Sequence, residues 1–333
     1  MSVSRLSIGK MRGLCATSTS NDVFTILAFD HRQSFANMLP SLDPSKNSYE
    51  QIVSAKSEVV RILAPHVSSV LLDPEYSAAQ MIYNRALPGK TGLVVALEET
   101  GYGGSTRART SRILPQWGIS KAKRMGADAV KLLIYYHPDA GELTDNLERL
   151  TTEVIDGCRQ ADIALFLEPV TYSIDPEVNK NTAEFAALRP GIIKETAHRL
   201  GSLGPDVLKM EFPIDANINP ERTNWESACE ALSQAAPCPW TVLSAGVNFE
   251  LFAQQVEIAC RCGASGFIGG RAVWREGISM PPAERETWLN EVAARRLDTL
   301  GDIAAKYSRP WSDFFPGIET NAGQDWYCSY DES

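Results

Sequence analysis

Several features that mark other classes of protein are absent from this sequence. No apolar run reaches the length needed to cross a bilayer, and the start of the chain lacks the apolar core of a secretory signal. The 41 acidic residues outnumber the 32 basic ones, which gives a net charge of −9. An acidic chain is a poor general binder of nucleic acid or anionic lipid. We therefore expect a cytoplasmic protein with neither nucleic acid nor a membrane as partner.

Cysteine, histidine and glycine occur without the spacings that signal a metal site, a disulfide or a nucleotide. Cys260 and Cys262 fall on an expected helix, where residues two apart face different directions, and the four histidines are scattered. Gly89-Lys-Thr91 resembles the end of a P-loop, but Asn84 stands where the first glycine must be. We therefore expect free thiols in a reducing compartment and a protein that works without a metal or other cofactor.

Short apolar runs alternate with amphipathic stretches along most of the chain. Eight runs have the near-continuous apolar character of strands buried on both faces: 24–30, 68–73, 92–98, 128–136, 164–168, 206–212, 240–244 and 266–271. The stretches 49–65 and 249–262 have the apolar spacing of helices, and Gly126 and Gly263 stand where helices should end. Eight alternations of strand and helix predict a single (β/α)₈ TIM barrel. An open doubly wound sheet is the alternative, although Asp30-His-Arg-Gln33 follows the first run instead of a glycine-rich turn.

The two ends of the chain differ in composition from the barrel, which we place at residues 21–310. Residues 1–20 are rich in serine and threonine, and we expect them to be loosely ordered. Residues 311–333 form an aromatic-rich tail. Exposed aromatic side chains at that density would be adhesive, so we expect this tail to pack over the barrel or against a partner subunit.

Two lysines stand inside expected strands, where apolar side chains are the rule. They are Lys131 and Lys209, and each has apolar neighbours on both sides in the sequence. Successive side chains of a strand point to opposite faces, and the apolar neighbours suit the helix layer. The alternation therefore directs Lys131 and Lys209 into the barrel, and the same reasoning directs Glu168 of the intervening strand inward.

The convergence of two lysines and a glutamate indicates Schiff-base chemistry. A buried ammonium costs several kcal/mol unless it is paired or loses its proton. A second ammonium and a low-dielectric wall lower the pKa of a lysine side chain, and a neutral amine attacks carbonyl groups. Lys209 would attack a ketone, Glu168 would move protons, and Lys131 would hold a substrate oxygen. A purely structural ion-pair triad is the alternative.

Polar residues at other strand ends add two hypotheses, because such barrels carry their sites there. Asp30, Asp73 and Glu98 could in principle hold Mg²⁺. Ser244-Ala-Gly246 and Gly269-Gly-Arg271 end the last two strands, where barrels commonly seat phosphate on backbone N–H groups, with an arginine for bidentate contact. The alternative for these two segments is a pair of tight turns that need glycine, with the arginine on the rim.

Eight segments, taken in order along the chain, form a specific pattern. They are Ala28-Phe-Asp-His-Arg32, Leu71-Leu-Asp-Pro-Glu-Tyr76, Glu98-Glu-Thr-Gly-Tyr102, Val130-Lys-Leu-Leu-Ile-Tyr-Tyr136, Leu167-Glu-Pro-Val170, Asp206-Val-Leu-Lys-Met-Glu211, Leu243-Ser-Ala-Gly246 and Gly269-Gly-Arg-Ala-Val-Trp274. Together they resemble the class I aldolases of the tagatose-1,6-bisphosphate aldolase family, and the related sulfofructose-phosphate aldolase of sulfoquinovose breakdown. The resemblance extends from about Phe24 to Trp311.

The resemblance implies a site and a role for each of its residues. The implied site comprises Lys209 as the Schiff-base lysine, Glu168 as the proton shuttle, Lys131 and Asp30 at the substrate hydroxyls, Ser244, Gly246, Gly270 and Arg271 at the phosphate of a dihydroxyacetone-phosphate half, and Arg32 and His31 at a distal anionic group. The family often has glutamine where this chain has His31, which leaves the distal group of the sugar open.

These residues predict a cofactor-free lyase, a class I aldolase of carbohydrate metabolism. It would cleave a ketohexose 1-phosphate with an anionic group on C6, such as tagatose-1,6-bisphosphate, to dihydroxyacetone phosphate and a three-carbon aldehyde. Segments 71–76 and 98–102 favour that substrate, whereas segment 263–274 favours 6-deoxy-6-sulfofructose 1-phosphate. A metal-dependent aldolase and a sugar-phosphate-binding regulator without turnover are the rival hypotheses. The resemblance also implies a homodimer or higher homo-oligomer.

Overall fold

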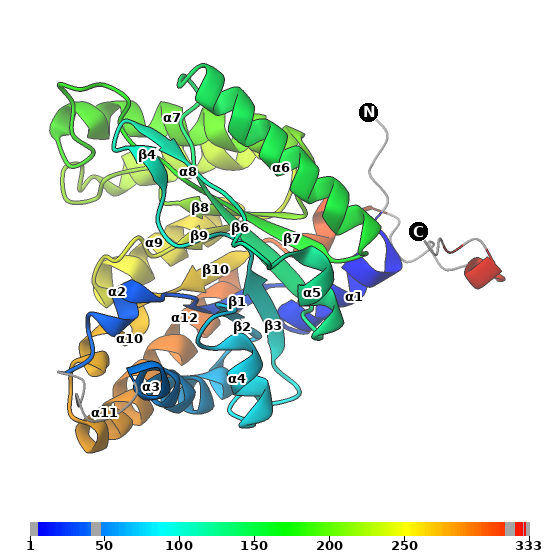
Figure 1. Ribbon diagram of the computed structural model, residues 1–333. Coiled ribbons are helices and arrows are strands. Elements are labelled where there is room, and N and C mark those ends of the chain that lie inside the picture. Colours follow the sequence, from blue (N-terminus) through cyan, green and yellow to red (C-terminus); the bar gives the residue numbers. More distant parts are fainter. Residues whose placement is uncertain (1–5, 41–47, 317–323, 329, 331–333) are drawn as a thin grey trace.

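Eight parallel strands close into a barrel in the computed structural model, which describes residues 6–40, 48–316, 324–328 and 330 (Figure 1). The strands are β1 (Phe24–Phe29), β2 (Ser69–Leu72), β3 (Gly92–Ala96), β6 (Ala129–Tyr135), β7 (Ala164–Val170), β8 (Val207–Glu211), β9 (Trp240–Leu243) and β10 (Gly266–Gly269). Their order around the barrel is β1-β10-β9-β8-β7-β6-β3-β2, and β2 pairs with β1 to close it. The prediction of a single (β/α)₈ barrel is confirmed, because each apolar run contains one barrel strand.

Helices surround the strands and connect them. They are α1 (Ile8–Thr17), α2 (Gln33–Ala36), α3 (Ser48–Leu63), α4 (Ala78–Tyr83), α5 (Ile119–Arg124), α6 (Glu142–Gln160), α7 (Ala183–Ser202), α8 (Arg222–Ala235), α9 (Phe249–Arg261), α10 (Arg271–Ile278), α11 (Pro282–Trp288) and α12 (Ala294–Tyr307), with short helical turns at Ala64–His66, Leu289–Ala293, Trp311–Phe314 and Trp326–Cys328. The stretches 49–65 and 249–262 correspond to α3 and α9. Gly126 and Gly263 follow α5 and α9 with φ of +96° and +106°, as left-handed helix ends require.

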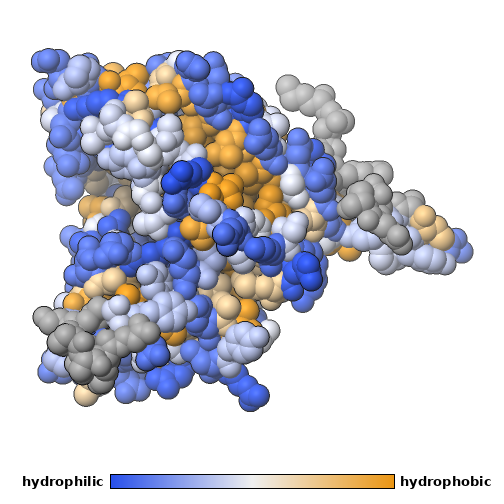
Figure 2. Space-filling model, viewed as in Figure 1, coloured by the Kyte–Doolittle hydropathy of each residue, from blue (hydrophilic) through white to orange (hydrophobic). Residues whose placement is uncertain are grey.

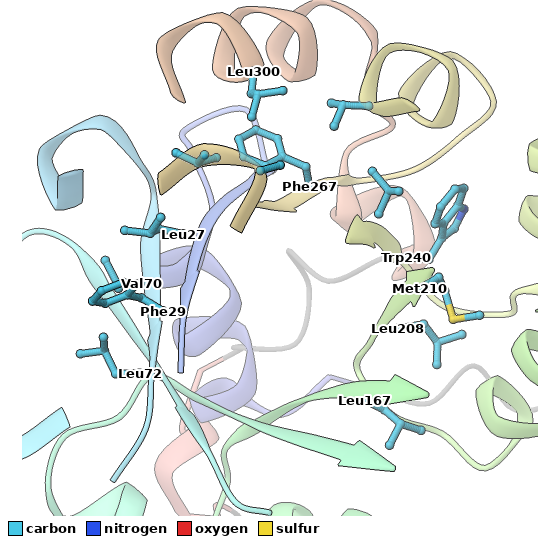
Figure 3. Close-up of a cluster of buried hydrophobic side chains, with 14 of the residues drawn as sticks. Leu27, Phe29, Val70, Leu72, Leu167, Leu208, Met210, Trp240, Phe267 and Leu300 are labelled. Carbon is cyan, nitrogen blue, oxygen red and sulfur yellow. The ribbon is translucent and has the colours of Figure 1, made fainter. Parts of the chain in front are cut away.

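The main core lies between the barrel and its helices. Alternate strand residues such as Leu27, Leu72, Leu167 and Leu208 are almost completely buried and point away from the barrel axis (Figure 3). These outward positions are the ones that alternation assigned to the helix layer, so the residues between them face the interior. On the outside, Figure 2 shows hydrophilic residues over most of one face, with apolar residues gathered beside α6. None of the helices described is long and apolar enough to span a membrane.

The barrel interior is apolar at the amino ends of the strands, and this end of the barrel is closed by other side chains. Phe24 and Phe166 meet edge to face across it, with ring centroids 5.2 Å apart. Leu14 of α1 and Trp311 pack under these rings, and neither side chain is exposed. The Trp311 indole donates to the hydroxyl of Ser18 at 3.0 Å, so its one polar atom is satisfied. Water is therefore excluded from the barrel on this side, and charged residues can reach solvent only at the opposite end.

The prediction that residues 1–20 are loosely ordered is wrong for residues 6–20; residues 1–5 lie outside the described part. Helix α1 contacts β3, β6 and β7 at the end of the barrel opposite α2 and α10 (Figure 1). Lys10 pairs with Asp206 at 2.8 Å, and Gly13 approaches so closely that a Cβ there would lie 2.2 Å from the Asp128 carbonyl oxygen. The amino-acid composition did not indicate this helix. Close contact of its backbone with the barrel and one ion pair, more than an apolar face, hold the helix in place.

The aromatic tail divides into a buried and an exposed part. Trp311 is buried and Phe315 packs against it, as expected for a tail that packs on the barrel. Trp326, Tyr327 and Tyr330 are exposed by 41%, 65% and 42%. Residues 317–323, 329 and 331–333, which also belong to the predicted tail, lie outside the described part. The expected contact with a partner subunit therefore stays a prediction for the exposed aromatic residues.

One pair of strands was not predicted. β4 (Gly103–Ser105) and β5 (Ala108–Thr110) form an antiparallel hairpin between β3 and β6. Arg107 of its turn donates hydrogen bonds to the carbonyl oxygens of Val178 at 2.6 Å and Ser173 at 3.3 Å, in the loop that follows β7. Neither strand has an apolar run, because the hairpin lies outside the core. The hairpin and the β7–α7 loop thus form one connected structure at the carboxyl end of the barrel.

Trp311→Ala should lower the free energy of unfolding by about 3–5 kcal/mol, because it opens a cavity beneath the barrel interior. Chemical denaturation followed by circular dichroism would measure the loss. Trp326→Ala removes an exposed indole 41% accessible to solvent and serves as the matched control, with an expected loss below about 1 kcal/mol. Equal losses in the two variants would show that Trp311 does not close the barrel.

Candidate active site

A cavity of about 380 Å³ opens at the carboxyl ends of the barrel strands. All ten residues predicted for the site line it: Asp30, His31, Arg32, Lys131, Glu168, Lys209, Ser244, Gly246, Gly270 and Arg271. They come from the ends of β1, β6, β7, β8, β9 and β10 and from the turns that follow them. Barrel closure thus brings together residues that are up to 241 positions apart, from Asp30 to Arg271 (271 − 30).

Lys131 lies in the centre of three carboxylates. Its Nζ is 2.6 Å from Glu98, 2.8 Å from Asp30 and 2.9 Å from Glu168, and the residue is only 1% exposed. Burial alone would favour the neutral amine. The carboxylates of Asp30, Glu168 and Glu98 outweigh it and hold the pKa of Lys131 well above its usual value. Lys131 is therefore a permanent ammonium.

Glu168 connects the two lysines. Its Oε2 accepts from Lys209 Nζ at 2.8 Å and lies 2.9 Å from Lys131 Nζ. Burial would raise the pKa of Glu168, but Lys131 and Lys209 lower it below its usual value. Burial also opposes ionisation of Asp30, yet the charge of Lys131 and then that of Lys209 keep the pKa of Asp30 far below the usual range. Both carboxylates are ionised at neutral pH.

His31 presents a neutral imidazole to the cavity. Its ring meets Trp274 edge to face at 5.0 Å, and its Nδ1 is 3.8 Å from Asp30. No hydrogen-bond partner for this Nδ1 is found among the described residues. Burial, aided by the positive charge of Arg271, lowers the pKa of His31 to about 4, although Asp30 opposes the shift. The ring can therefore exchange hydrogen bonds with a ligand without adding charge.

Arg32 lies at the side of the cavity formed by the β3–β4 connection. It donates to the Thr100 hydroxyl and to the Glu98 carbonyl oxygen, both at 2.9 Å, and pairs with Glu75 at 2.9 Å. The guanidinium is itself buried, whereas the Glu75 side chain is 43% exposed. Arg32 thus lines the cavity, and its guanidinium is paired with a partly exposed carboxylate.

The turns after the neighbouring strands β9 and β10 lie side by side at the cavity. Ala245 and Gly246 have φ of +47° and +82°, and the Gly270 N–H points at the Ser244 hydroxyl at 3.4 Å. Helix α10 begins at Arg271, so its N-terminal N–H groups face the same turn. The combination of backbone donors, a hydroxyl and a guanidinium is suited to a phosphate group.

One predicted carboxylate does not line the cavity, and one unpredicted lysine does. Asp73 lies behind β1 and β2, where it pairs with the fully buried Lys56. Lys180 from the β7–α7 loop reaches the cavity and donates to Glu211 at 2.9 Å. Sequence reasoning missed Lys180 because a lysine in a long polar loop carries no pattern. The inward direction of Glu211 was the only available signal for this pair.

Carboxylates around the cavity form ion pairs with lysine side chains. Among the described residues there is no group of three or more His, Cys, Asp or Glu side chains arranged to hold a metal ion. Three carboxylates could in principle have held Mg²⁺. Asp30 and Glu98 instead pair with Lys131, and Asp73 pairs with Lys56.

A model of the DeoC/LacD aldolase family matches residues 24–276, from the first residue of β1 to the last turns of α10. The chain belongs to this family of aldolases. It is 32% identical to tagatose 1,6-diphosphate aldolase 2 of Streptococcus pyogenes serotype M3, over 87% of this chain and 93% of that protein. It is 31% identical to tagatose 1,6-diphosphate aldolase 2 of Enterococcus faecalis, over 92% and 96% of the two chains.

The fold is also found in solved aldolase structures. A crystal structure of an archaeal fructose 1,6-bisphosphate aldolase superimposes with a TM-score of 0.56, and covers 88% of this chain and 98% of that one. At 18% identity this likeness concerns the fold alone. The predicted resemblance to class I aldolases and the prediction of a lyase are confirmed by the family and its curated members.

His31→Asn should reduce the loss of stability on acidification. In the unfolded chain this histidine binds a proton below a pH of about 6.5, whereas in the folded chain it does so only below about pH 4. The free energy of unfolding therefore falls as the pH drops through this window. The slope from this one group is at most about 1.4 kcal/mol per pH unit. Urea denaturation at several pH values between about 4 and 7 would measure the difference between variant and parent.

His198→Asn, on the outer helix α7, is the matched control, since it removes an exposed histidine. If the His31 variant loses stability as steeply as the parent and the control, the imidazole is not excluded from protonation by the fold.

Proposed function

We propose that the protein is a class I aldolase in which Lys209 forms a Schiff base with a ketose phosphate. The observation that carries the proposal is the unequal distribution of carboxylates over the two lysines. Lys131 has three carboxylate partners within 3 Å, whereas the single carboxylate found to pair with Lys209 in the described part of the chain is Glu168, whose oxygen it shares with Lys131. Lys131 is thus held by three ion pairs, whereas one shared ion pair holds Lys209.

The chemistry follows from the position of the Lys209 amine beside the fixed ammonium of Lys131. Lys209 attacks the C2 carbonyl of the sugar, and the carbinolamine loses water to become an iminium. Glu168, at 2.8 Å from Lys209, delivers and removes the protons of these steps. The iminium withdraws electrons while the C4 hydroxyl loses its proton and the C3–C4 bond breaks, which releases the aldehyde and leaves an enamine. Protonation at C3 and hydrolysis then release dihydroxyacetone phosphate.

Asp30 and Lys131 are assigned to the substrate hydroxyls. They form a fixed ion pair at 2.8 Å next to the Schiff-base lysine, with Asp30 as acceptor and Lys131 as donor. Because Lys131 is held charged by its surroundings, it stabilises negative charge that develops on a substrate oxygen. The pair needs no rearrangement at the moment of reaction.

The two ends of the cavity define the substrate class. The Ser244–Gly246 turn, Gly270 and Arg271 would hold a phosphate on C1, and Arg32 would receive an anionic group on C6 after displacing Glu75. A ketohexose 1-phosphate with a C6 anion satisfies both ends. Tagatose-1,6-bisphosphate is the first candidate, supported by the names of the curated relatives. 6-Deoxy-6-sulfofructose 1-phosphate has the same arrangement of charges and is the alternative.

Borohydride should trap dihydroxyacetone phosphate on Lys209 as a stable secondary amine, because it reduces the iminium in place. Peptide mass spectrometry of the reduced protein would locate the adduct. Lys209→Met should abolish labelling. Lys180→Met, which removes another lysine of the same cavity, should retain a labelled Lys209 and is the control. An adduct on Lys180 or Lys131 in place of Lys209 would refute the assignment.

A turnover screen addresses the sugar. Tagatose-1,6-bisphosphate, fructose-1,6-bisphosphate and sulfofructose 1-phosphate should be compared by coupled detection of dihydroxyacetone phosphate, with and without a chelator. We expect the highest kcat/KM for tagatose-1,6-bisphosphate and no effect of the chelator, because the cavity carboxylates are paired with lysines. Preference for the sulfosugar would select the alternative substrate. Binding without turnover of any of them would favour the sugar-phosphate-binding regulator.

A further inference from the structure

Two arginines of helix α10 lie next to each other at the phosphate end of the cavity. Arg271 is the first residue of the helix and Arg275 lies one turn later on the same side. Arg271 lines the cavity, and no hydrogen bond or ion pair of its guanidinium is found among the described residues. Arg275 donates a hydrogen bond from Nη2 to the carbonyl oxygen of Gly246.

Both guanidiniums meet at Gly246. A Cβ built on this glycine would lie 3.3 Å from Cζ and Nη2 of Arg271 and 3.5 Å from Nη2 of Arg275. Gly246 has a φ of +82°, so glycine is also favoured by the backbone there. The turn after β9 therefore lies against two cationic groups. The absence of a side chain at Gly246 allows both guanidiniums to come close to its backbone.

The carboxylate of α10 that follows these arginines has its hydrogen bonds elsewhere. Glu276, the next residue after Arg275, directs both of its oxygens to Arg296 of α12 at 3.0 Å. Burial, followed by the like charge of Arg275, lowers the pKa of Arg271 below its usual value. Like charges one helical turn apart repel each other, and this repulsion is relieved when an anion binds between them.

We propose that Arg275 is a second guanidinium of the phosphate subsite, which acts together with Arg271 on the terminal phosphate of the substrate. The proposal deepens the proposed function and rests on it. A phosphate monoester carries a charge of nearly −2 at neutral pH, and two guanidiniums match it where one would not. Arg271 approaches from the cavity, whereas the exposed Arg275 covers the solvent side of the Gly246 turn. The pair therefore binds the phosphate from two directions.

This arrangement assigns Arg275 to affinity for the phosphate and not to bond cleavage. The scissile bond lies near Lys209, whose partner Glu168 belongs to β7, while Arg275 reaches only the turn after β9. Loss of Arg275 should raise KM for phosphorylated substrates more than it lowers kcat. The affinity should also depend on ionic strength more steeply in the parent than in a variant without this charge.

Calorimetric titration with inorganic phosphate tests the proposal without requiring turnover. Arg275→Ala should weaken phosphate binding by about tenfold, because one charge-assisted contact is lost. Arg275→Gln should weaken it to the same extent, since glutamine keeps a donor for the Gly246 carbonyl but loses the charge. Arg295→Ala, on the exposed side of α12, makes the same change in net charge and is the control, with binding equal to that of the parent.

Three outcomes would overturn the proposal. Equal phosphate affinity in Arg275→Ala and Arg295→Ala would show that Arg275 does not touch the anion. Full affinity in Arg275→Gln would show that the residue only positions the Gly246 turn. A parent protein that binds no phosphate in competition with dihydroxyacetone phosphate would remove the subsite itself. Failure of the Schiff-base assignment would instead appear as absence of borohydride labelling at Lys209, with the phosphate titration unchanged.

Discussion

The shared hydrogen bond of Glu168 with Lys131 and Lys209 is the interaction around which the active end of the barrel is organised. Two lysines that are 1% and 4% exposed are stabilised in the barrel interior by pairing with carboxylates, three of them around Lys131 and one beside Lys209. The carboxylates are not divided equally: three pair with Lys131, and one of these three also pairs with Lys209. Removal of Glu168 would leave both lysines changed, since its one oxygen serves them both.

The position of this charged layer depends on the apolar layers beneath it. Phe24, Phe166, Leu14 and Trp311 fill the lower interior and exclude water from that side. In such surroundings the attraction between Lys131 and its carboxylates is stronger than it would be at the surface. Helix α1 and Trp311 belong to the two ends of the chain, so both ends contribute to the environment in which the chemistry takes place.

The periphery of the cavity is built from less regular parts. The β4–β5 hairpin and the β7–α7 loop are connected through Arg107, and Lys180 of that loop reaches the cavity. The phosphate end depends on Arg271 and Arg275 of α10 and on the turn around Gly246. In the proposed function these parts recognise the substrate, whereas the strand residues carry out the reaction. Loops at the end of a barrel can vary while the strands that they connect are kept.

The sequence was sufficient for the eight strands and for the direction of their side chains. The period of a strand is two residues, so the apolar neighbours of Lys131 and Lys209 already determined that both lysines face the interior. It was not sufficient for α1, the β4–β5 hairpin or Lys180. These elements are held by close backbone contacts and individual hydrogen bonds, which produce no periodic pattern of residues in the sequence.

Which carboxylate meets which lysine was decided by the tertiary structure alone. Asp30 and Lys131 are 101 residues apart, and they meet because closure of the barrel brings the end of β1 across from β6. In the same closed barrel Glu98 pairs with Lys131, whereas Asp73 pairs with Lys56 of the surrounding helix α3. The sequence by itself therefore determined which charged groups enter the barrel, since alternation is a local property of a strand. Their pairing, and with it the difference between Lys131 and Lys209, depends on strand order and register, which exist only in the closed barrel.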